Sequence, residues 1–165
     1  MEVSVVSAQV LANTLNMSRS EWLQHRRKGI GGSDAAAIVG LDRYRSAFDV
    51  YAEKVGIKAE EPDNEAMRQG RDLEQYVAER FMEATGKKVR RRNAILQHPE
   101  YPFLIANIDR WVVGENAGLE CKTTSILNQH KFSKGEYPPN YYVQCMHYMA
   151  VTGAERWYLG VLVLN

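Results

Sequence analysis

The sequence predicts an α/β protein in which helices flank a small mixed β-sheet. Segments patterned as helices come first, followed by a long helix, three strand-like runs, another helix and a final strand-like run. The chain has 165 residues, of which 45% are hydrophobic and 25% charged, and these values fit one globular domain with a core of ordinary size. Helices packed on a sheet would bury the apolar sides of all these elements. We therefore expect residues 1–165 to form a single domain.

Serine caps predict the short helices in the first third of the chain. Ser18 and Glu21 have the spacing of a capping box, and two further serines precede short runs that end at glycine. Residues 1–17 are apolar and weakly patterned, so we expect a short helix or an arm there. The predicted helices are about two turns after Ser18, residues 34–39 after Ser33 and residues 47–55 after Ser46.

The glycine-rich stretch at residues 29–32 leads directly into a predicted helix, an arrangement that can bind an anion. Backbone N–H groups at such a helix start point outward, and Ser33 and Arg26 would add a hydroxyl and a guanidinium group. Asp34 offers an alternative, because an acid in the first turn satisfies the helix dipole without a ligand. A phosphate site and simple capping both remain open on spacing alone.

A long helix is predicted over residues 64–85. Apolar residues recur along it at spacings of mostly four, and Gly86 ends it. Gly70 and Glu74 lie one turn apart, so the small residue would let another element approach beside the carboxylate. A polar connector that contains proline, residues 60–64, precedes the helix. Taken alone, Glu74 has the features of a solvated helix acid.

The run KKVRRR, at residues 87–92, predicts an exposed edge strand with charges on both faces. Lysine and arginine protect such an edge against pairing with other chains. The same charges could instead follow the phosphates of a nucleic acid. The sequence favours neither function over the other.

A β-hairpin is predicted around the turn sequence GENAG. The first strand covers residues 103–113, and the second contains LECKT at residues 119–123. The shortest loop that joins them consists of Gly114 and Glu115, a length typical of tight hairpins.

This hairpin would bring two carboxylates together. With the two-residue loop, Asp109 lies opposite Glu120 with Cβ atoms roughly 4.5–5.5 Å apart. Side chains alternate along a strand, so Glu120 and Lys122 share a face. Carboxylates this close repel each other, and Mg²⁺ prefers hard oxygen ligands, so the group predicts a site that cleaves phosphodiesters. An ordinary cross-strand salt bridge on an exposed hairpin is the alternative.

The last predicted elements are a helix at residues 141–152 and a strand at residues 157–165. Two prolines precede the helix and Gly153 ends it. Gln144 and Tyr148 lie one turn apart on a shared face of this helix. No predicted element follows the strand to pair with it, so we expect the chain to be a C-terminally truncated part of a longer protein.

Composition argues against several classes of protein. The sequence has no apolar run of about 18 residues and no signal-peptide pattern, so we expect a cytoplasmic protein without a membrane span. Two distant cysteines argue against a disulfide framework, and the four histidines have no metal-ligand spacing. Because the net charge is only +1, any DNA binding must come from a local patch.

Taken together, the motifs resemble those of a known nuclease family. GRDLE, IDRW, LECKT and QCMHY occur in the order of the G-x-x-x-E, D, E-x-K and Q-x-x-x-Y motifs of the RecB-like PD-(D/E)xK nucleases. The stretch EWLQHRRKGIGGSDAAAIVG resembles the N-terminal signature of the YqaJ-type viral recombinases, the family of lambda exonuclease. Around Asp109, the sequence departs from the common pattern of the family. Ile108 stands where many relatives have proline, and Arg110 where many have glycine. The resemblance, which begins near residue 21, implies a restriction-endonuclease-like fold.

The resemblance also implies a role for each matching residue. Asp109, Glu120 and Glu74 would bind two Mg²⁺ ions, or Mn²⁺, with help from the backbone carbonyl of Cys121. Lys122 would orient the attacking water. The other matches are Gln144 and Tyr148, which would steady the site, and Arg26 and Ser33, which would hold the 5′-phosphate of a DNA end.

The activity implied by the family is a 5′→3′ exonuclease on linear double-stranded DNA in phage-type recombination. A single-strand annealing protein would be its partner, and a ring-shaped trimer its oligomer. The alternatives are a RecB-like nuclease of other polarity, an endonuclease, or a non-catalytic DNA-end-binding module on the same fold. A shared Mg²⁺ would require the carboxylates of Glu74, Asp109 and Glu120 to converge within about 3–5 Å.

Overall fold

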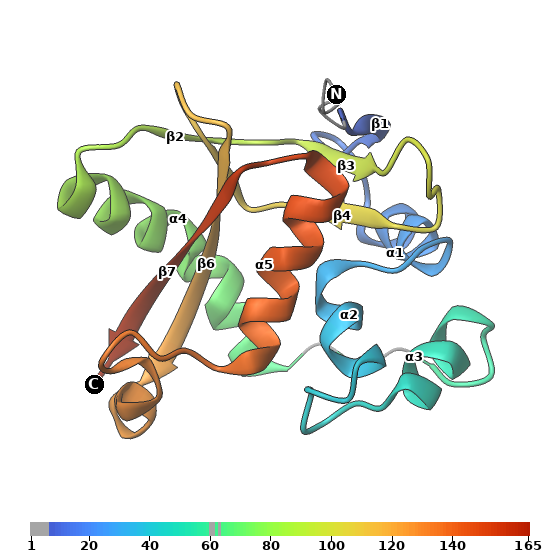
Figure 1. Ribbon diagram of the computed structural model, residues 1–165. Coiled ribbons are helices and arrows are strands. Elements are labelled where there is room, and N and C mark those ends of the chain that lie inside the picture. The colour runs from blue at the N-terminus through green and yellow to red at the C-terminus, as the bar shows by residue number, and fades with distance from the viewer. Residues whose placement is uncertain (1–6, 60–61, 63) are drawn as a thin grey trace, which may run out of the picture. The chain divides into compact units, whose positions relative to one another are not determined.

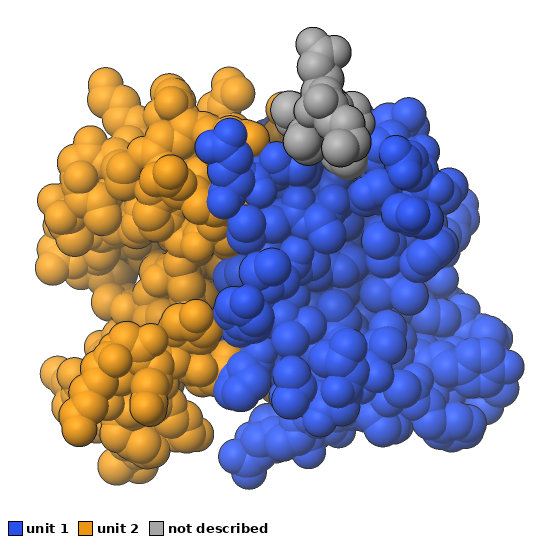
Figure 2. Space-filling view, in the orientation of Figure 1, with its two compact units in different colours: residues 1–60, 93–107, 139–155 blue, residues 61–92, 108–138, 156–165 orange. Residues whose placement is uncertain are grey.

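The computed structural model describes residues 7–59, 62 and 64–165 (Figure 1). The expectations for residues 1–6 and for most of the connector at 60–64 lie outside these residues. The chain divides into two compact units, each made of three separate segments (Figure 2). Unit 1 consists of Met1–Glu60, Asn93–Asn107 and Pro139–Glu155, and unit 2 of Glu61–Arg92, Ile108–Pro138 and Arg156–Asn165.

Unit 1 contains a three-stranded antiparallel sheet in the order β1-β3-β4. Its strands are β1 (Gln9–Asn13), β3 (Ala94–Gln97) and β4 (Ile105–Asn107). The short helix or arm expected at the N-terminus is therefore a strand where the structure describes it, because β3 supplies backbone partners for it. Ile95 and Ile105 are buried in the core of this unit.

Four helices complete the described part of unit 1. The helix α5 packs against α2 and lies against β3 and β4. Small buried residues of α2, Ala36 and Ala37, make this close packing possible, and Val151 of α5 is fully buried. The four helices are α1 (Arg19–Arg27), α2 (Gly32–Ile38), α3 (Ala47–Lys54) and α5 (Pro139–Thr152).

Unit 2 is built on a four-stranded sheet in the order β2-β5-β6-β7. The first three strands are antiparallel, and β6 and β7 are parallel. The long helix α4 (Glu65–Thr85) packs against β6 and β7, with Val77 and Leu119 buried. The remaining elements are β2 (Val89–Arg91), β5 (Arg110–Val112), β6 (Ala117–Ser125), the 3-10 helix η1 (Ile126–Phe132) and β7 (Arg156–Leu164).

Most predicted helix starts are confirmed by their caps. Ser18 and Ser46 form capping boxes, and Asn64 caps α4 by accepting a hydrogen bond from the Met67 amide. The prediction for Ser33 is wrong. Gly31 is the N-cap and Ser33 lies inside the first turn of α2, because the Asp34 carboxylate accepts the Gly31 N–H at 3.0 Å.

The strand expected at residues 103–113 is in fact two strands in different sheets. β4 pairs with β3, whereas β5 pairs with β2 and β6, and the chain bends at Asp109 between them. The edge position predicted for the basic run is confirmed, because β2 is an outer strand of its sheet. The 3-10 helix η1 was not predicted.

Both units combine a sheet with helices, so the predicted α/β class is confirmed. None of the helices in the described residues is long and apolar enough to cross a membrane.

Candidate functional site

β6 carries an acid and a base on one side of the unit 2 sheet. It lies between β5 and β7 and pairs with β7 over its whole length. Glu120 is 3% exposed, and its Oε1 lies 2.6 Å from the Nζ of Lys122. The two side chains therefore project to the same side, as alternation along a strand requires.

Asp109 meets Glu120 from the neighbouring strand. Arg110 pairs with Leu119, so the next position in the same register places Asp109 opposite Glu120. Asp109 Oδ2 accepts a hydrogen bond from the Cys121 amide at 2.7 Å, and the charge of Glu120 acts on the Asp109 carboxyl group, whose pKa it raises. Asp109, Glu120 and Lys122 thus form one cluster within unit 2, which we call the DEK cluster.

Burial and neighbouring carboxylates raise the pKa of both acids in the DEK cluster. For Asp109, burial is the largest cause, followed by the charges of Glu120 and Glu74, and the pKa lies well above 3.8. Burial also raises the pKa of Glu120, although Lys122 opposes the shift. A divalent cation would remove this conflict, because it stabilises both ionised carboxylates. The two carboxylates are hard oxygen donors of the kind that Mg²⁺ prefers.

Cys121 could contribute only its backbone carbonyl to a cation. Burial raises the pKa of its thiol far above the ordinary value, so the sulfur stays protonated. Its amide is already bound to Asp109. A carbonyl oxygen is a hard donor of the kind that suits Mg²⁺.

Glu74 is directed to an arginine. Its Oε1 accepts a hydrogen bond from Arg110, whose side chain is 3% exposed and also donates to the Asp109 carbonyl and to Gln75. Glu74 still contributes to the raised pKa of Asp109, so its charge lies within electrostatic reach. Across the described residues, no three His, Cys, Asp or Glu side chains are grouped in a way that could hold a metal ion. The structure brings Asp109 and Glu120 together but does not group Glu74 with them.

Arg110 is the residue near this cluster that sequence reasoning missed. The available signal was its position, since a charged residue follows Asp109 where many relatives have glycine. The expectation for Gly70 is also wrong. A Cβ added there would meet no described atom within 4 Å, so no described element approaches α4 at that point.

Unit 1 contains a pocket of about 120 Å³ beside Arg26 and Ser33. Arg26 donates a hydrogen bond to the Ser33 hydroxyl at 3.2 Å, and its guanidinium carbon lies 5.1 Å from the centre of the Trp22 ring. The structure thus unites the arginine, the serine and the tryptophan of the N-terminal signature. The pocket is lined by Trp22, Arg26, Gly31, Gly32, Ser33, Ile95, Ile105, Asn107 and Tyr148.

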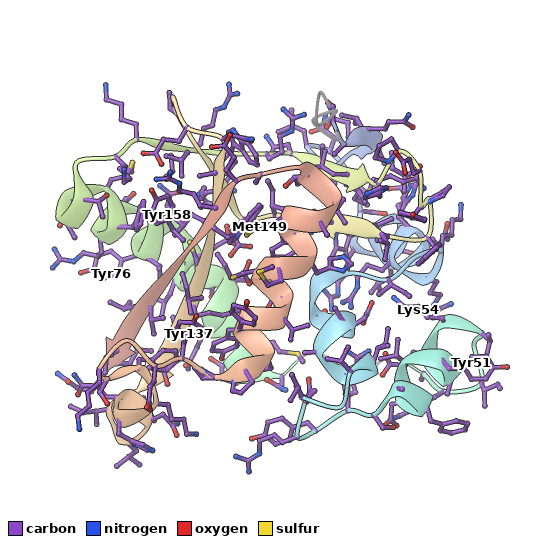
Figure 3. All side chains as sticks on the ribbon, in the orientation of Figure 1. Tyr51, Lys54, Tyr76, Tyr137, Met149 and Tyr158 are labelled. Carbon is purple, nitrogen blue, oxygen red and sulfur yellow. The ribbon has the colours of Figure 1, made fainter. Side chains whose placement is uncertain are left out.

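Asp34 supports this pocket from the interior. Its carboxylate is fully buried and lies 3.3 Å from Arg26, 3.1 Å from Arg45 and 2.7 Å from Lys54, which Figure 3 labels on α3. Burial would raise its pKa, but the charges of Arg26 and Lys54 outweigh burial and lower it. Lys54 also donates to the Arg26 carbonyl at 2.7 Å, which fixes the backbone of α1.

Gln144 and Tyr148 belong to unit 1, where they pack against the glycine-rich turn. The Gln144 amide donates to the Tyr148 hydroxyl at 2.8 Å, and Tyr148 lines the pocket. A Cβ at Gly32 would lie 2.6 Å from the Tyr148 ring and 3.0 Å from Gln144. Position 32 therefore requires glycine, because the Tyr148 ring on α5 leaves no room for a Cβ atom.

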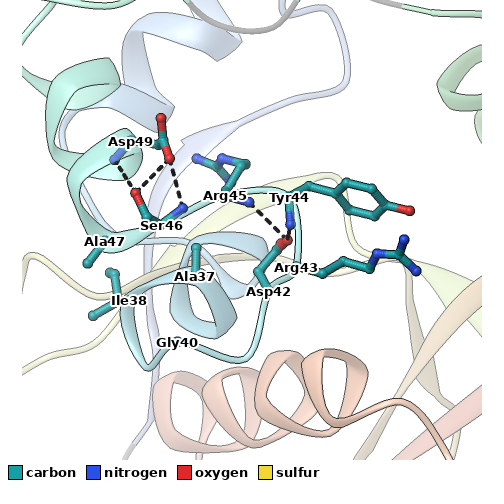
Figure 4. A pocket seen from close by; sticks show the side chains of 10 residues that line it. All are labelled: Ala37, Ile38, Gly40, Asp42, Arg43, Tyr44, Arg45, Ser46, Ala47 and Asp49. Carbon is teal, nitrogen blue, oxygen red and sulfur yellow. Dashed lines mark hydrogen bonds between the residues drawn. The ribbon is translucent and has the colours of Figure 1, made fainter.

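A second pocket, of about 370 Å³, lies over the α2–α3 loop (Figure 4). Asp42 accepts hydrogen bonds from the Tyr44 and Arg45 amides, while Ser46 and Asp49 cap α3. Its polar groups are used to shape the loop and to begin the helix. They define no chemistry of their own.

Known proteins resemble the chain both in sequence and in structure. It is 49% identical over 159 residues to the uncharacterized protein YqaJ of Bacillus subtilis (strain 168), covering 94% of the chain and 50% of that protein. The chain thus spans about half the length of this curated relative. Its structure resembles the alkaline exonuclease LHK-Exo of Laribacter hongkongensis, with a TM-score of 0.67, 23% identity and coverage of 85% of this chain and 74% of the other.

A crystal structure of LHK-Exo in complex with dAMP matches with a TM-score of 0.71 and 23% identity, over 88% of this chain and 74% of the other. At this identity, the likeness establishes the fold. The family follows from a separate match. The model of the YqaJ-like viral recombinase domain covers residues 21–155, and the chain belongs to this family.

Proposed function

We propose that the protein is a metal-dependent deoxyribonuclease that digests linear double-stranded DNA from its 5′ ends. The observation that carries the proposal is the DEK cluster, in which the buried carboxyl group of Glu120 and the half-buried one of Asp109, both with raised pKa values, adjoin a lysine. Membership of the YqaJ-like family and the fold shared with an alkaline exonuclease support it. The dAMP bound to LHK-Exo is a nucleotide of the kind that an exonuclease releases.

In this proposal, each residue of the cluster has one task. Asp109 and Glu120 hold the cation, with the Cys121 carbonyl as a further donor. Lys122 orients the attacking water and offsets the negative charge that develops on the phosphate. Bound Mg²⁺ would lower the pKa of water and stabilise the leaving oxygen. Arg110 holds Glu74 within electrostatic reach of Asp109, so that the Glu74 charge raises the pKa of that carboxyl group.

The pocket of unit 1 is proposed to bind the 5′-phosphate. Arg26 offers a guanidinium fork, which suits phosphate oxygens, and the Ser33 hydroxyl is a second donor. Tyr148, held by Gln144, forms the wall of this pocket. By family resemblance, the proposal extends to a ring-shaped trimer and a single-strand annealing partner in phage-type recombination.

The first test uses Glu120→Ala and Lys122→Ala. Each should reduce Mg²⁺-dependent digestion of linear duplex DNA by about 10²-fold or more, because the charge stabilisation of the transition state is removed. Release of label from 5′-labelled and 3′-labelled duplex measures both rate and direction. Added Mg²⁺ should also raise the Tm of the parent protein and should not raise that of Glu120→Ala.

Matched controls are Glu83→Ala on α4 and Lys131→Ala on η1, which are exposed and remove the same charges. Both should digest DNA like the parent. Full activity of Glu120→Ala and Lys122→Ala would refute the nuclease assignment of the cluster. Cleavage of covalently closed circular DNA would show that the enzyme is an endonuclease and would refute the exonuclease assignment.

The second test compares duplexes with 5′-phosphate and 5′-hydroxyl ends. The parent should prefer the phosphorylated end, and Arg26→Ala should abolish the preference while retaining slow digestion of both. Arg27→Ala, the neighbouring exposed arginine, is the control. Equal rates on both ends by the parent, or an Arg26→Ala variant that keeps the preference, would remove this role.

A further inference from the structure

The basic run on β2 has no part in the sites described above. Within residues 84–99 there is no aspartate or glutamate, whereas five of these sixteen residues are lysine or arginine. Since the whole chain has a net charge of +1, the chain outside this run carries a net charge of −4. The five residues, which we call the basic strip, are Lys87, Lys88, Arg90, Arg91 and Arg92.

The structure places the basic strip along one edge of the unit 2 sheet. β2 pairs with β5 on one side and is the outermost strand on the other. Pairing extends beyond β2 itself, because the Val113 amide donates to the Lys88 carbonyl at 2.8 Å. Residues 88–91 are therefore a regular extended segment, on which side chains alternate between the two faces of the sheet.

The register assigns the strip residues to two faces. Arg90 is opposite Trp111, and Trp111 is opposite Gly118, so all three share a face. Glu120, two residues beyond Gly118, projects to the same face. By the same alternation, Lys88, whose carbonyl pairs with Val113, lies on the Arg90 side. The side of the sheet that carries the DEK cluster thus carries Lys88 and Arg90 at its edge, and Arg92 follows the last residue of β2.

Arg91 projects to the opposite face. It pairs with Arg110, which contacts Glu74 and Gln75 of α4. Helix α4 covers this face of the sheet, since it packs against β6 and β7. Arg91 therefore supplies a natural control for the cations on the other side.

The cations on the DEK side are exposed, so their charges are accessible to an external partner. In the described part of the chain, neither an ion pair nor a side-chain hydrogen bond is formed by Lys88, Arg90 or Arg92. Lys87 differs, because it pairs with Glu115 at 2.5 Å and lies over the Tyr158 ring. One paired lysine would already protect an edge strand against aggregation. Three further cations at alternate positions repel one another and exceed that need.

We infer that Lys88, Arg90 and Arg92 bind the phosphodiester backbone of duplex DNA on the DEK side of the unit 2 sheet. Arginine and lysine at regular spacing along an edge contact phosphates without reading bases, so binding would be independent of sequence and strongly dependent on salt. The inference rests on the proposed function for the identity of the ligand. It adds a second contact that is separate from the 5′-phosphate pocket.

The test measures DNA binding without catalysis. Anisotropy of a labelled blunt duplex with 5′-hydroxyl ends is recorded in EDTA over a series of KCl concentrations. For Arg90→Gln/Arg92→Gln, the slope of log K against log[KCl] should fall in magnitude by about 1.8, since each phosphate that the protein no longer neutralises lowers it by about 0.9. At about 0.1 M salt, the affinity should be lower by roughly tenfold or more.

The matched control is Arg80→Gln/Arg91→Gln, which removes two exposed arginines from the other side of unit 2 and should leave the slope unchanged. Equal slopes for the parent and Arg90→Gln/Arg92→Gln would overturn the inference. So would aggregation of that variant with an unchanged slope, since the strip would then serve edge protection. Digestion by the parent in Mg²⁺ tests the proposed function separately, because the binding assay contains no metal.

Discussion

Asp34 is a fully buried acid that holds three cations in place. Arg26, Arg45 and Lys54 all contact its carboxylate, and the lysine makes the shortest contact. From the sequence alone, Asp34 could be interpreted only as an acid that satisfies the helix dipole in place of a bound phosphate. Its true partners were hidden because Arg45 and Lys54 lie far along the chain and meet it only through the packing of α2 and α3.

Replacing Asp34 by Asn should cost about 3–5 kcal/mol at pH 7, because three buried or half-buried cations lose their counter-charge. The folded pKa of Asp34 lies below its ordinary value of 3.8. Its contribution is therefore complete above that value and is lost as the pH falls through the folded pKa. The difference in stability between parent and variant should stay constant from pH 7 down to about pH 4 and shrink at lower pH, as measured by urea unfolding.

Asp49→Asn is the control for this experiment. Asp49 pairs with the exposed Lys58, so its replacement should destabilise the protein much less than Asp34→Asn does at pH 7. A stability difference for Asp34→Asn that stays constant with pH would show that the cations do not depend on the Asp34 charge.

At the scale of elements, the contact between α2 and α5 depends on one glycine. Gly32→Ala would place a methyl group 2.6 Å from the Tyr148 ring, so either the ring or the helix must move. We expect a loss of stability of about 1–3 kcal/mol, as for other overpacked cores. Gly70→Ala meets open space within α4 and should instead stabilise by about 0.5–1 kcal/mol. Urea unfolding of the two variants gives both values, and equal effects would contradict the packing described.

The elements differ in how well the sequence predicts them. Helix caps such as Ser18 and Ser46 were predictable, because a capping box is a contact between residues three apart. The division of residues 103–113 between two sheets was not, since it depends on which distant strand each half pairs with. The same limit applies to β1, which becomes a strand through its pairing with β3.

At the scale of the whole molecule, the local contacts of the candidate site were predictable from the sequence and its long-range contacts were not. The pairing of Asp109 with Glu120 was predictable from the loop, because the hairpin register depends on local geometry. The bond between Glu74 and Arg110 joins residues 36 apart and could not be inferred from periodicity. The assembly of each unit from three segments leaves no mark in composition and could not be predicted from the sequence.

The parallel pairing of β6 with β7 has a consequence for biosynthesis. β7 is synthesised some thirty residues after β6, so on the ribosome LECKT is an exposed strand edge until residues 156–164 have emerged. The acid pair, which joins β5 to β6, can form before β7 emerges, whereas a messenger cut short before codon 156 would leave one edge of β6 unpaired and prone to aggregation. Cleavage of the folded protein by a protease between η1 and α5 would not expose this edge, because β6 and β7 are already paired in the folded protein.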